Sequence, residues 1–297
     1  LELASDQGLQ LSIVHFDHAW RPESGADATW VGALAARLQI AFHLGHAAGP
    51  RPTANREQSA RRARYGYFQG LIAAGVADRI ATGHTQDDQA ETVLLRMLRG
   101  AGPAGLAGIW PSRPIAVGAA PGTLVRPVLG LSHAALQDWL RARGQIWRDD
   151  PSNQDQSLRR NWVRHALMPI LRQEVNPALA AGLGTLAEVM RAEEENWAQV
   201  MGPLADKVWR VEGVELITMR AELLAFPLAA QRRLLREGVR RLRGNLLRLQ
   251  FHHVEAVVQA LRQGPHPPRH YLLAGVECQL NRREVRLGRP PARSNAL

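Results

Sequence analysis

The sequence predicts an α/β fold in which helices cover both sides of a parallel sheet, followed by a smaller, mainly helical domain that ends in a β-hairpin. Up to about residue 172, short apolar runs alternate with segments whose apolar residues have helical spacing. This alternation is typical of a parallel sheet with crossover helices. Beyond that point amphipathic helices dominate. A chain of 297 residues is long enough for two domains, each with its own core.

In the first part of the chain, apolar and partly β-branched runs predict the strands, and apolar residues that recur every three or four positions predict the helices. The predicted strands cover residues 11–16, 40–44, 79–82 and 123–128, and the predicted helices cover residues 26–38, 55–74, 87–98, 134–143 and 160–171. Gly100 follows the third helix as a stop signal, and Ser132 is a good N-cap for the fourth.

In the second part, residues 178–201, 228–243 and 252–262 predict amphipathic helices. Residues Tyr271 to Leu287 predict a terminal β-hairpin that turns near Asn281–Arg283. At the other end of the chain, Leu1–Ala4 is typical of the last turn of a helix, so we expect the chain to begin inside a domain.

The charge of the chain favours a polyanionic partner. A formal net charge of +10 and a pI near 11.1 suit nucleic acid or an anionic membrane surface. Lys207 is the one lysine, and the planar guanidinium of the many arginines suits phosphate contact. No run approaches the ~18 apolar residues of a membrane span, and no N-terminal signal pattern is seen, so we expect no membrane partner. The single cysteine, Cys278, rules out an internal disulfide, which makes a cytoplasmic location the default.

Polar side chains follow two of the predicted strands. The cluster His15-Phe16-Asp17-His18 follows the first strand, and Gly83-His84 follows the third. Because ligands of open parallel sheets bind beyond the carboxyl ends of the strands, both clusters are candidate site residues. One short loop around Asp17 offers too few spaced ligands for a metal ion, so we expect no metal site there.

Two carboxylates lie close to His84 in the predicted structure. Asp88 and Glu91 are about one helical turn apart at the start of the helix that follows His84, so all three side chains can point into one crevice. On spacing alone, the alternative is helix capping by Asp87 together with solvated charges.

The run Gly83-His84-Thr85-Gln86-Asp87-Asp88-Gln89-Ala90-Glu91-Thr92 resembles the signature of the tRNA(Ile)-lysidine synthase family, which reads His, two variable residues and Asp-Asp-Gln-Ala-Glu-Thr. Ordered matches extend over residues 11–170, and residues 171–297 resemble the family more loosely. The further matches are Asp17-His18, Arg21-Pro22-Glu23-Ser24, Arg61-Arg62-Ala63-Arg64-Tyr65, Leu95-Arg96-Met97-Leu98-Arg99-Gly100, Gly105-Leu106-Ala107-Gly108, Arg126-Pro127, Asp150-Pro151-Ser152-Asn153 and Arg160-Asn161-Trp162-Val163-Arg164.

The resemblance implies a PP-loop ATPase domain with an adenine-nucleotide alpha hydrolase-like fold over residues 1–172 and a mainly helical tRNA-binding or substrate domain over residues 173–297. It implies a ligase that acts on an isoleucine tRNA with a CAU anticodon. ATP, with Mg²⁺, first adenylates the C2 oxygen of the first anticodon cytidine. The side-chain amine of free L-lysine then displaces AMP and leaves lysidine.

Each step of that reaction needs particular side chains. Carboxylates must hold the ammonium groups of lysine, for which Asp88 and Glu91 are suited, and a base must take the amine proton, for which His84 and Asp88 are candidates. The ATP contacts expected from strand-end position and family likeness are Asp17, His18, Arg61, Arg64 and Arg160.

The basic residues have plainer alternatives. Without the resemblance, Arg61–Arg64 would be a solvated helix face, and Arg160 would pair with Asp149 or Asp150. The helix over residues 228–243 is expected to track the tRNA backbone, with a solvated face as its alternative. The tRNA-binding candidates on it are Arg232, Arg236 and Arg240.

One element of the family pattern is missing. Family members cradle the ATP pyrophosphate with a Ser-Gly-Gly-x-Asp-Ser loop after their first strand, and this sequence lacks that loop. Ser24-Gly25-Ala26-Asp27 is only superficially similar, because it has no second glycine. We therefore expect an N-terminally truncated member whose 297 residues alone do not form lysidine.

Two other interpretations are open. A tRNA-thiolating enzyme of the same superfamily would commonly need paired cysteines, and the lone Cys278 argues against it. A non-catalytic tRNA-binding remnant would show the same charge pattern. The oligomeric state is open, a homodimer included, and so are the identity of the general base and the means of telling tRNA(Ile) from the methionine tRNA.

Overall fold

The computed structural model describes residues 6–20, 24–47, 56–115, 121–150, 155, 157–263 and 267–289. The chain divides into two compact units, Leu1–Arg191 and Ala192–Leu297, and helix α9 (Leu179–Val208) contributes residues to both. The expected helix end at Leu1–Ala4 and the motif residues 21–23 and 151–153 lie outside the described residues. Within the described part of the chain, no helix is long and apolar enough to cross a membrane. The functional division near residue 172 stays a prediction.

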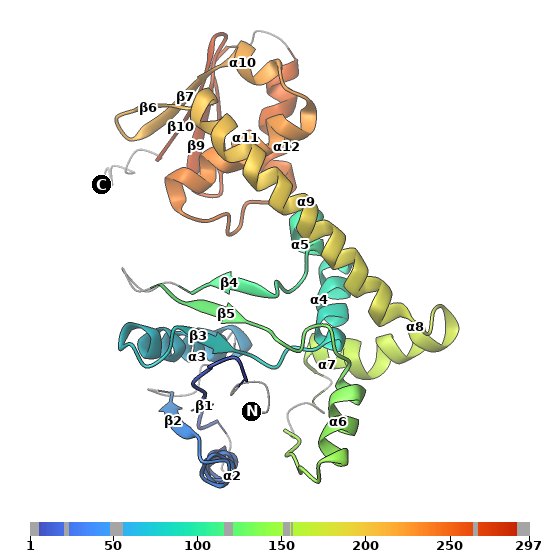
Figure 1. The fold of residues 1–297 in the computed structure, drawn as a ribbon. Coiled ribbons are helices and arrows are strands. Elements are labelled where there is room, and N and C mark those ends of the chain that lie inside the picture. Colours follow the sequence, from blue (N-terminus) through green and yellow to red (C-terminus); the bar gives the residue numbers. More distant parts are fainter. Residues whose placement is uncertain are drawn as a thin grey trace, which may run out of the picture. The chain divides into compact units, whose positions relative to one another are not determined.

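The strands of the first unit confirm the predicted parallel pairing. β1 (Ser12–Asp17) pairs in parallel with β2 (Ala41–His46), and β3 (Arg79–Ala81) pairs in parallel with β5 (Thr123–Val125). β4 (Ser112–Pro114) adds an antiparallel edge to β5. In the described residues these strands form two sheets, of two and three strands, where the sequence predicted one (Figure 1).

Helices follow the strands of the first unit as their apolar spacing predicts. They are α2 (Ser24–Arg37), α3 (Arg56–Ala73), α4 (Gln86–Leu98), α5 (Pro103–Leu106), α6 (His133–Ala142), α7 (Arg159–Trp162) and α8 (Met168–Glu174). The parallel pair β1–β2 needs a crossover, which α2 supplies. The predicted helix over residues 160–171 is divided, because the π-helical turn η2 (Val163–Leu167) separates α7 from α8.

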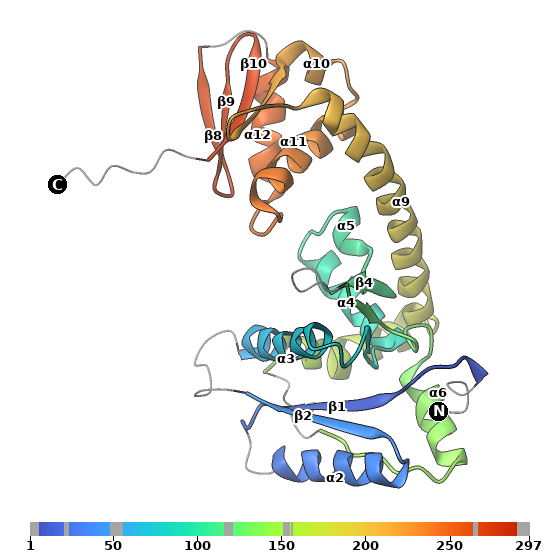
Figure 2. The same ribbon diagram turned by 60° about the vertical axis from the view of Figure 1, so that its left-hand side comes forward.

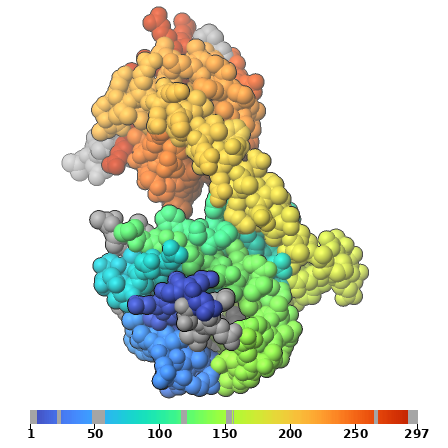
Figure 3. Space-filling model, in the orientation of Figure 1, coloured from blue at the N-terminus to red at the C-terminus, as the bar shows by residue number. Residues whose placement is uncertain are grey.

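Two apolar clusters hold the first unit together. In the first, Phe68 and Ile72 of α3 pack with Leu124 of β5 and with its neighbours in the sheet. The second joins the inner face of α4 to Val163, Met168 and the first turns of α9. This second cluster fixes α4 relative to α7, η2 and α8, and therefore fixes the side chains that these helices present to one another. The turn from α8 into α9 stands out from the surface of this unit (Figure 3).

The second unit is a five-stranded antiparallel sheet with helices packed on one face (Figure 2). The strand order is β6-β7-β10-β9-β8, with β6 (Arg210–Glu212), β7 (Glu215–Met219), β8 (Arg269–Leu273), β9 (Val276–Leu280) and β10 (Glu284–Gly288). The helices are α10 (Arg220–Leu224), α11 (Leu228–Arg243) and α12 (Phe251–Arg262). The predicted helices over residues 228–243 and 252–262 are thus confirmed, and the sheet is larger than the predicted hairpin.

The hairpin prediction was right at one turn and missed another. The chain turns at residues 281–283, as expected, but it also turns at Ala274–Gly275, which divides the predicted first strand into β8 and β9. Both residues of this turn have positive φ, of 52° and 95°. The apolar side chains on either side continue without a polar break, so the sequence pattern there is that of one strand. Strands β6 and β7 are short, and the exposed β6 carries little apolar pattern.

Candidate functional site

The candidate site begins where β3 ends. The backbone N–H of Thr82 donates to the carbonyl of Val125 at 3.0 Å, which extends the β3–β5 ladder by one residue. Thr85 is then the N-cap of α4. Its hydroxyl accepts from the N–H of Asp88 at 3.3 Å, and Asp88 Oδ2 accepts from the N–H of Thr85 at 2.8 Å. This capping box makes Thr85, not Asp87, the cap of the helix, and it orients the Asp88 carboxylate.

Asp88 and Glu91 face two arginines that come from α7 and η2. Arg160 donates from Nη2 to Asp88 Oδ1 at 2.9 Å and from Nε to Glu91 Oε2 at 3.0 Å. Arg164 donates from Nη2 to the same Asp88 oxygen at 2.8 Å and from Nε to Glu91 Oε1 at 2.6 Å. The side chains of Asp88 and Glu91 are only 17% and 3% exposed, so these pairs are largely shielded from water on the acid side. We call these four residues the acid–arginine cluster.

The acid–arginine cluster shows which carboxylates pair with Arg160, and it adds Arg164 to the candidate site. The acidic partners of Arg160 are Asp88 and Glu91, where the sequence alternative was Asp149 or Asp150. The sequence predicts no role for Arg164 beyond its place in the motif Arg160-Asn161-Trp162-Val163-Arg164. Its spacing of four residues from Arg160 was the available signal, because side chains four apart share a helix face.

The π-helical turn η2 carries Arg164 and sets the direction of its side chain. π-Turns are rare and often occur at functional sites, because the extra residue turns a side chain away from the regular helical direction. Val163 and Met168 anchor the two ends of the turn in the core, at 1% and 3% exposure. Burial lowers the pKa of Arg164, but hydrogen bonds and charge attraction from Glu91 and Asp88 outweigh it and leave the pKa raised.

His84 lies beside this cluster in a half-buried position. Its Nδ1 is 2.9 Å from the hydroxyl of Thr82, which orients the ring. Burial lowers the pKa of His84 to about 4; the negative charge of Asp88 opposes the shift, and the positive charges of Arg126, Arg160 and Arg61 add to it. The imidazole is therefore neutral at pH 7 and is free to accept a proton.

Asp17 and His18 stand at the carboxyl end of β1, as expected. Asp17 is buried, and its Oδ1 accepts from the N–H of Ala19 at 2.7 Å. Burial raises the pKa of Asp17, but hydrogen bonds from Ala19 and Ser24 and the charges of nearby histidines together lower it by more, so the net shift is downward. The Nδ1 atom of His18 is buried without a hydrogen-bond partner among the described residues. A buried polar atom that lacks a hydrogen-bond partner in the protein can form a hydrogen bond with a bound ligand.

Arg61 and Arg64 lie on α3 near these residues. Burial lowers the pKa of Arg64, and Arg64 is in turn close enough to His18 to lower the pKa of that imidazole, after burial. Arg61 lies over the ring of Tyr65, with Cζ 4.9 Å from the ring centroid. Among the described residues neither arginine pairs with a carboxylate, so both guanidinium groups could meet an anion.

An open pocket of about 820 Å³ adjoins the acid–arginine cluster. Asp88, Glu91 and Arg164 line it together with the starts of α4, α6 and α9, whereas His84 and Arg160 are not part of its lining. Asp87 holds one wall in place, because its carboxylate accepts from Arg172 Nη2 at 2.6 Å and from the N–H of His133 at 2.7 Å. The pocket is large enough for an amino acid, and charged groups of both signs reach it.

The basic face of α11 is largely neutralised inside the second unit. Arg232 pairs with Glu255 at 2.8 Å, and Arg240 pairs with Glu237 at 2.5 Å. Arg236 differs, because in the described part of the chain it has no hydrogen-bonded or ion-paired acceptor. Burial lowers the pKa of Arg236, and Arg233 adds to that shift. Of the three predicted tRNA contacts, Arg236 is thus the one whose guanidinium keeps its donors open.

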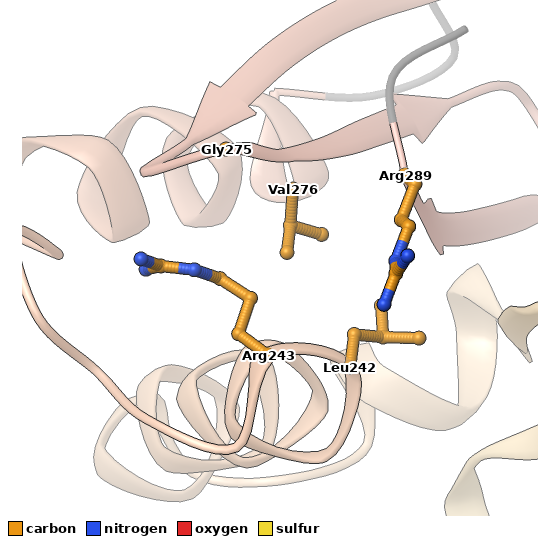
Figure 4. A pocket seen from close by; sticks show the side chains of 5 residues that line it. All are labelled: Leu242, Arg243, Gly275, Val276 and Arg289. Carbon is orange, nitrogen blue, oxygen red and sulfur yellow. The ribbon is translucent and has the colours of Figure 1, made fainter. Parts of the chain in front are cut away.

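A second, smaller hollow of about 420 Å³ lies in the second unit (Figure 4). Arg243 and Arg289 border it, together with Leu242 and the Gly275–Val276 turn. Arg243 donates from Nη1 to the carbonyl of Leu247 at 2.9 Å. The hollow contains none of the predicted site residues.

Comparison with known proteins shows which family this chain is similar to. A model of the PP-loop domain family matches residues 1–171. The tRNA(Ile)-lysidine synthase of Solibacter usitatus (strain Ellin6076) is 43% identical over 286 residues, which are 95% of this chain and 62% of that protein. The tRNA(Ile)-lysidine synthases of Gloeobacter violaceus and Thermosynechococcus vestitus are each 35% identical, over 93% and 98% of this chain and 83% and 81% of their own lengths.

Among solved structures, the U34-tRNA thiolase NcsA from Methanococcus maripaludis, with its [4Fe-4S] cluster, is similar over 63% of this chain and 66% of that chain, with a TM-score of 0.49 and 13% identity.

The chain spans less than two thirds of the length of the Solibacter relative and more than four fifths of the length of the Gloeobacter relative. With a PP-loop domain over its first 171 residues and relatives of 35–43% identity along most of its length, this chain belongs to the tRNA(Ile)-lysidine synthase family.

Proposed function

We propose that this chain provides the lysine-binding and tRNA-binding parts of a tRNA(Ile)-lysidine synthase. The reaction joins free L-lysine to C2 of the first anticodon cytidine of a tRNA(Ile) with a CAU anticodon and consumes ATP. The observation that carries the proposal is the acid–arginine cluster, in which two carboxylates and two guanidinium groups meet at 2.6–3.0 Å beside an open pocket. We place the reaction in the cytoplasm, where tRNA, ATP and free amino acids occur together.

The cluster matches the charges of free lysine. Lysine at neutral pH carries two ammonium groups and one carboxylate, so its site must offer acceptors and donors side by side. Asp88 and Glu91 supply the acceptors, and Arg164, which lines the pocket with them, supplies a planar donor fork for the carboxylate. Asp88 Oδ1 is shared by two guanidinium groups, and an incoming ammonium group would take the place of one of them.

The amine of lysine must lose a proton before it can attack. His84 is the candidate acceptor, because it is neutral and stands next to Asp88 in the sequence-predicted crevice. With a pKa of about 4 the imidazole is a weak base in the free chain. The positive charges of Arg126, Arg160 and Arg61 contribute to that low pKa. A bound polyphosphate would offset them and raise the pKa of His84 towards neutrality, where a general base works best.

ATP is the activating substrate, bound as its Mg²⁺ complex. The unpartnered His18 Nδ1 and the two guanidinium groups of Arg61 and Arg64 fit a nucleotide at the carboxyl end of β1. Arg160 is engaged by Asp88 and Glu91, so its proposed contact with ATP would require it to release one of them.

The proposed reaction has two steps, adenylation of the cytidine and transfer of lysine. The C2 oxygen of the cytidine attacks the α-phosphorus of ATP, and pyrophosphate leaves. The ε-nitrogen of lysine then attacks C2, the bond from C2 to the adenylate oxygen breaks, and AMP leaves. The proton released by the amine passes to His84 or Asp88. Positioning of the two reactants and removal of that proton are what this chain would supply.

Ligand-dependent tRNA binding tests the proposal. Filter binding of a tRNA(Ile) transcript with a CAU anticodon would be measured on the 297-residue chain with and without L-lysine and MgATP. We expect lysine and MgATP each to change the retention of the tRNA, and Asp88→Asn to abolish the effect of lysine. A chain that binds tRNA and ignores both small molecules would be a tRNA-binding remnant, and the proposal would be wrong. Incorporation of radiolabelled lysine on the same samples would measure turnover.

A further inference from the structure

Three arginines meet at the side chain of Tyr65 in the first unit. Arg61, one helical turn earlier on α3, has its Cζ 4.9 Å from the centre of the tyrosine ring and donates from Nη2 to the tyrosine hydroxyl at 3.3 Å. Arg113 of β4 has its Cζ 5.0 Å from the same ring centre. Arg126, directly after β5, lies close enough to Tyr65 for the tyrosine to raise the pKa of its guanidinium group. We call these four residues the Tyr65 cluster.

Arg126 is the buried member of the Tyr65 cluster. It is 5% exposed and donates from Nη1 to the carbonyl of Trp110, while its backbone N–H donates to the carbonyl of Pro111 at 2.8 Å. Its Nε is buried and has no hydrogen-bond partner among the residues that the structure describes. A buried, charged donor without an acceptor is unfavourable by itself, so this atom indicates a missing ligand.

Among the described residues, no carboxylate balances the positive charge of the Tyr65 cluster. In the described part of the chain, neither Arg61, Arg113 nor Arg126 is paired with a carboxylate. Burial lowers the pKa of Arg126, Tyr65 opposes that shift, and the nearby charges of Arg113 and Arg61 add to it. The acid–arginine cluster of the same unit differs in this respect, because each of its two guanidinium groups is paired with two carboxylates.

The position of the cluster relates it to the site. Thr82 donates from its backbone to the carbonyl of Val125, so Arg126 leaves β5 next to the segment that carries His84. The charge of Arg126 is felt at His84, where it contributes to the lowered pKa. Arg61 and Arg113 are exposed, so a ligand can approach from solvent.

We propose that the Tyr65 cluster binds a phosphate group, with Arg113, Arg126 and Tyr65 as contacts in addition to Arg61. Planar guanidinium groups match phosphate oxygens in pairs, and the tyrosine hydroxyl adds a neutral donor at their centre. The phosphate belongs either to the RNA backbone or to the nucleotide, the two phosphate-bearing substrates of the proposed function on which this inference rests.

Arg113→Gln is the sharpest variant. Arg113 is exposed and its contact is with the tyrosine ring, so its replacement should leave the fold intact. Arg79→Gln is the matched control, because Arg79 is 68% exposed at the opposite end of β3 and only approaches Asp78 at 3.9 Å. Arg126→Lys keeps the buried charge and removes the fork, and its thermal melting would be recorded beside the wild type. Binding of MgATP and of a short anticodon stem–loop RNA would be measured for each at several salt concentrations.

We expect Arg113→Gln to weaken binding of one probe by roughly 10-fold relative to Arg79→Gln, as loss of a charge-assisted hydrogen bond does. If the phosphate is that of RNA, the plot of log affinity against log salt for the RNA also becomes less steep, by about 0.7 in slope. If it is that of the nucleotide, only MgATP binding weakens. Equal affinities of Arg113→Gln and Arg79→Gln for both probes would overturn the inference while leaving the proposed function standing. A wild-type chain that binds neither probe would overturn the proposed function itself.

Discussion

Arg164 and Glu91 form a two-point ion pair, with Nε to Oε1 at 2.6 Å and Nη2 to Oε2 at 3.1 Å. Glu91 is almost fully buried at 3% exposure, and Arg160 is its other guanidinium partner. The pair therefore ties the helix that carries the signature residues to the π-helical turn.

Replacing Arg164 by Met should destabilise the first unit, because Glu91 then keeps one cation where it had two. We expect the free energy of unfolding to fall by about 1–3 kcal/mol, less than for a fully buried pair because Arg160 remains. Urea denaturation monitored by limited proteolysis would measure it. Arg79→Met, at a loose pair of exposed residues, should change stability by no more than about 0.5 kcal/mol. Equal effects of the two variants would contradict the structural role of Arg164.

The pKa of His84 gives a dependence of stability on pH. The pKa of His84 is about 4 in the folded chain and 6.5 for an ordinary histidine, so between these values the unfolded chain binds more protons than the folded one. The contribution of His84 to stability is therefore fully present above pH 6.5 and is lost as the pH falls towards 4. Its slope is at most about 1.4 kcal/mol per pH unit. His84→Gln should flatten the profile in this window; an unchanged profile would show that His84 is not held neutral by its surroundings.

Gly108 should tolerate a side chain poorly. It has a φ of +64°, and an added Cβ would lie 2.6–2.9 Å from the side-chain amide of Gln89, whose Oε1 accepts from the N–H of Ile109. We expect Gly108→Ala to lower the stability of the first unit by about 1–3 kcal/mol. Gly100→Ala is the control, since Gly100 also has a positive φ, of +73°, but open space around it. The difference in melting between the two variants isolates the contact with Gln89; no difference would contradict it.

Arg236 and Arg240 should differ as tRNA contacts. Arg236 has open donors, whereas Arg240 is held by Glu237 on the same helix. We expect Arg236→Gln to weaken tRNA binding several-fold at low salt and to reduce the salt dependence, as loss of one phosphate contact does. Arg240→Gln should have a smaller effect. Filter binding of tRNA at several salt concentrations would compare them, and equal effects would assign both residues to long-range attraction only.

The sequence predicted the elements that depend on periodicity. Helices α11 and α12 follow from apolar residues on one face, and the parallel pairs follow from strand and helix alternation. The turn at Ala274–Gly275 could not be found in this way, because a two-residue turn with positive φ needs no polar residue beyond the glycine. The capping role of Thr85 was hidden for a related reason, since Asp87 was an equally plausible cap by residue type.

The sequence predicted that residues of the candidate site lie together, but it did not predict how they pair. His84, Asp88 and Glu91 follow a strand end and share a helix face, which are local features of the sequence. The partners of Asp88 and Glu91 are far away in the sequence, with Arg160 69 positions after Glu91, and no local pattern connects them. The same holds for α11, where ion pairing to Glu255 and Glu194 from other helices decides which arginines remain open.

Binding of L-lysine to the Asp88→Asn variant tests the central claim most directly. Equilibrium dialysis with radiolabelled lysine would compare the wild type with Asp88→Asn and with Asp87→Asn, whose carboxylate lines the same pocket but is held by Arg172 and the N–H of His133. The acid–arginine cluster as lysine site predicts that Asp88→Asn weakens lysine binding about 10-fold or more and that Asp87→Asn leaves it within about two-fold. Lysine binding that is unchanged in Asp88→Asn, or absent in the wild type, would contradict it.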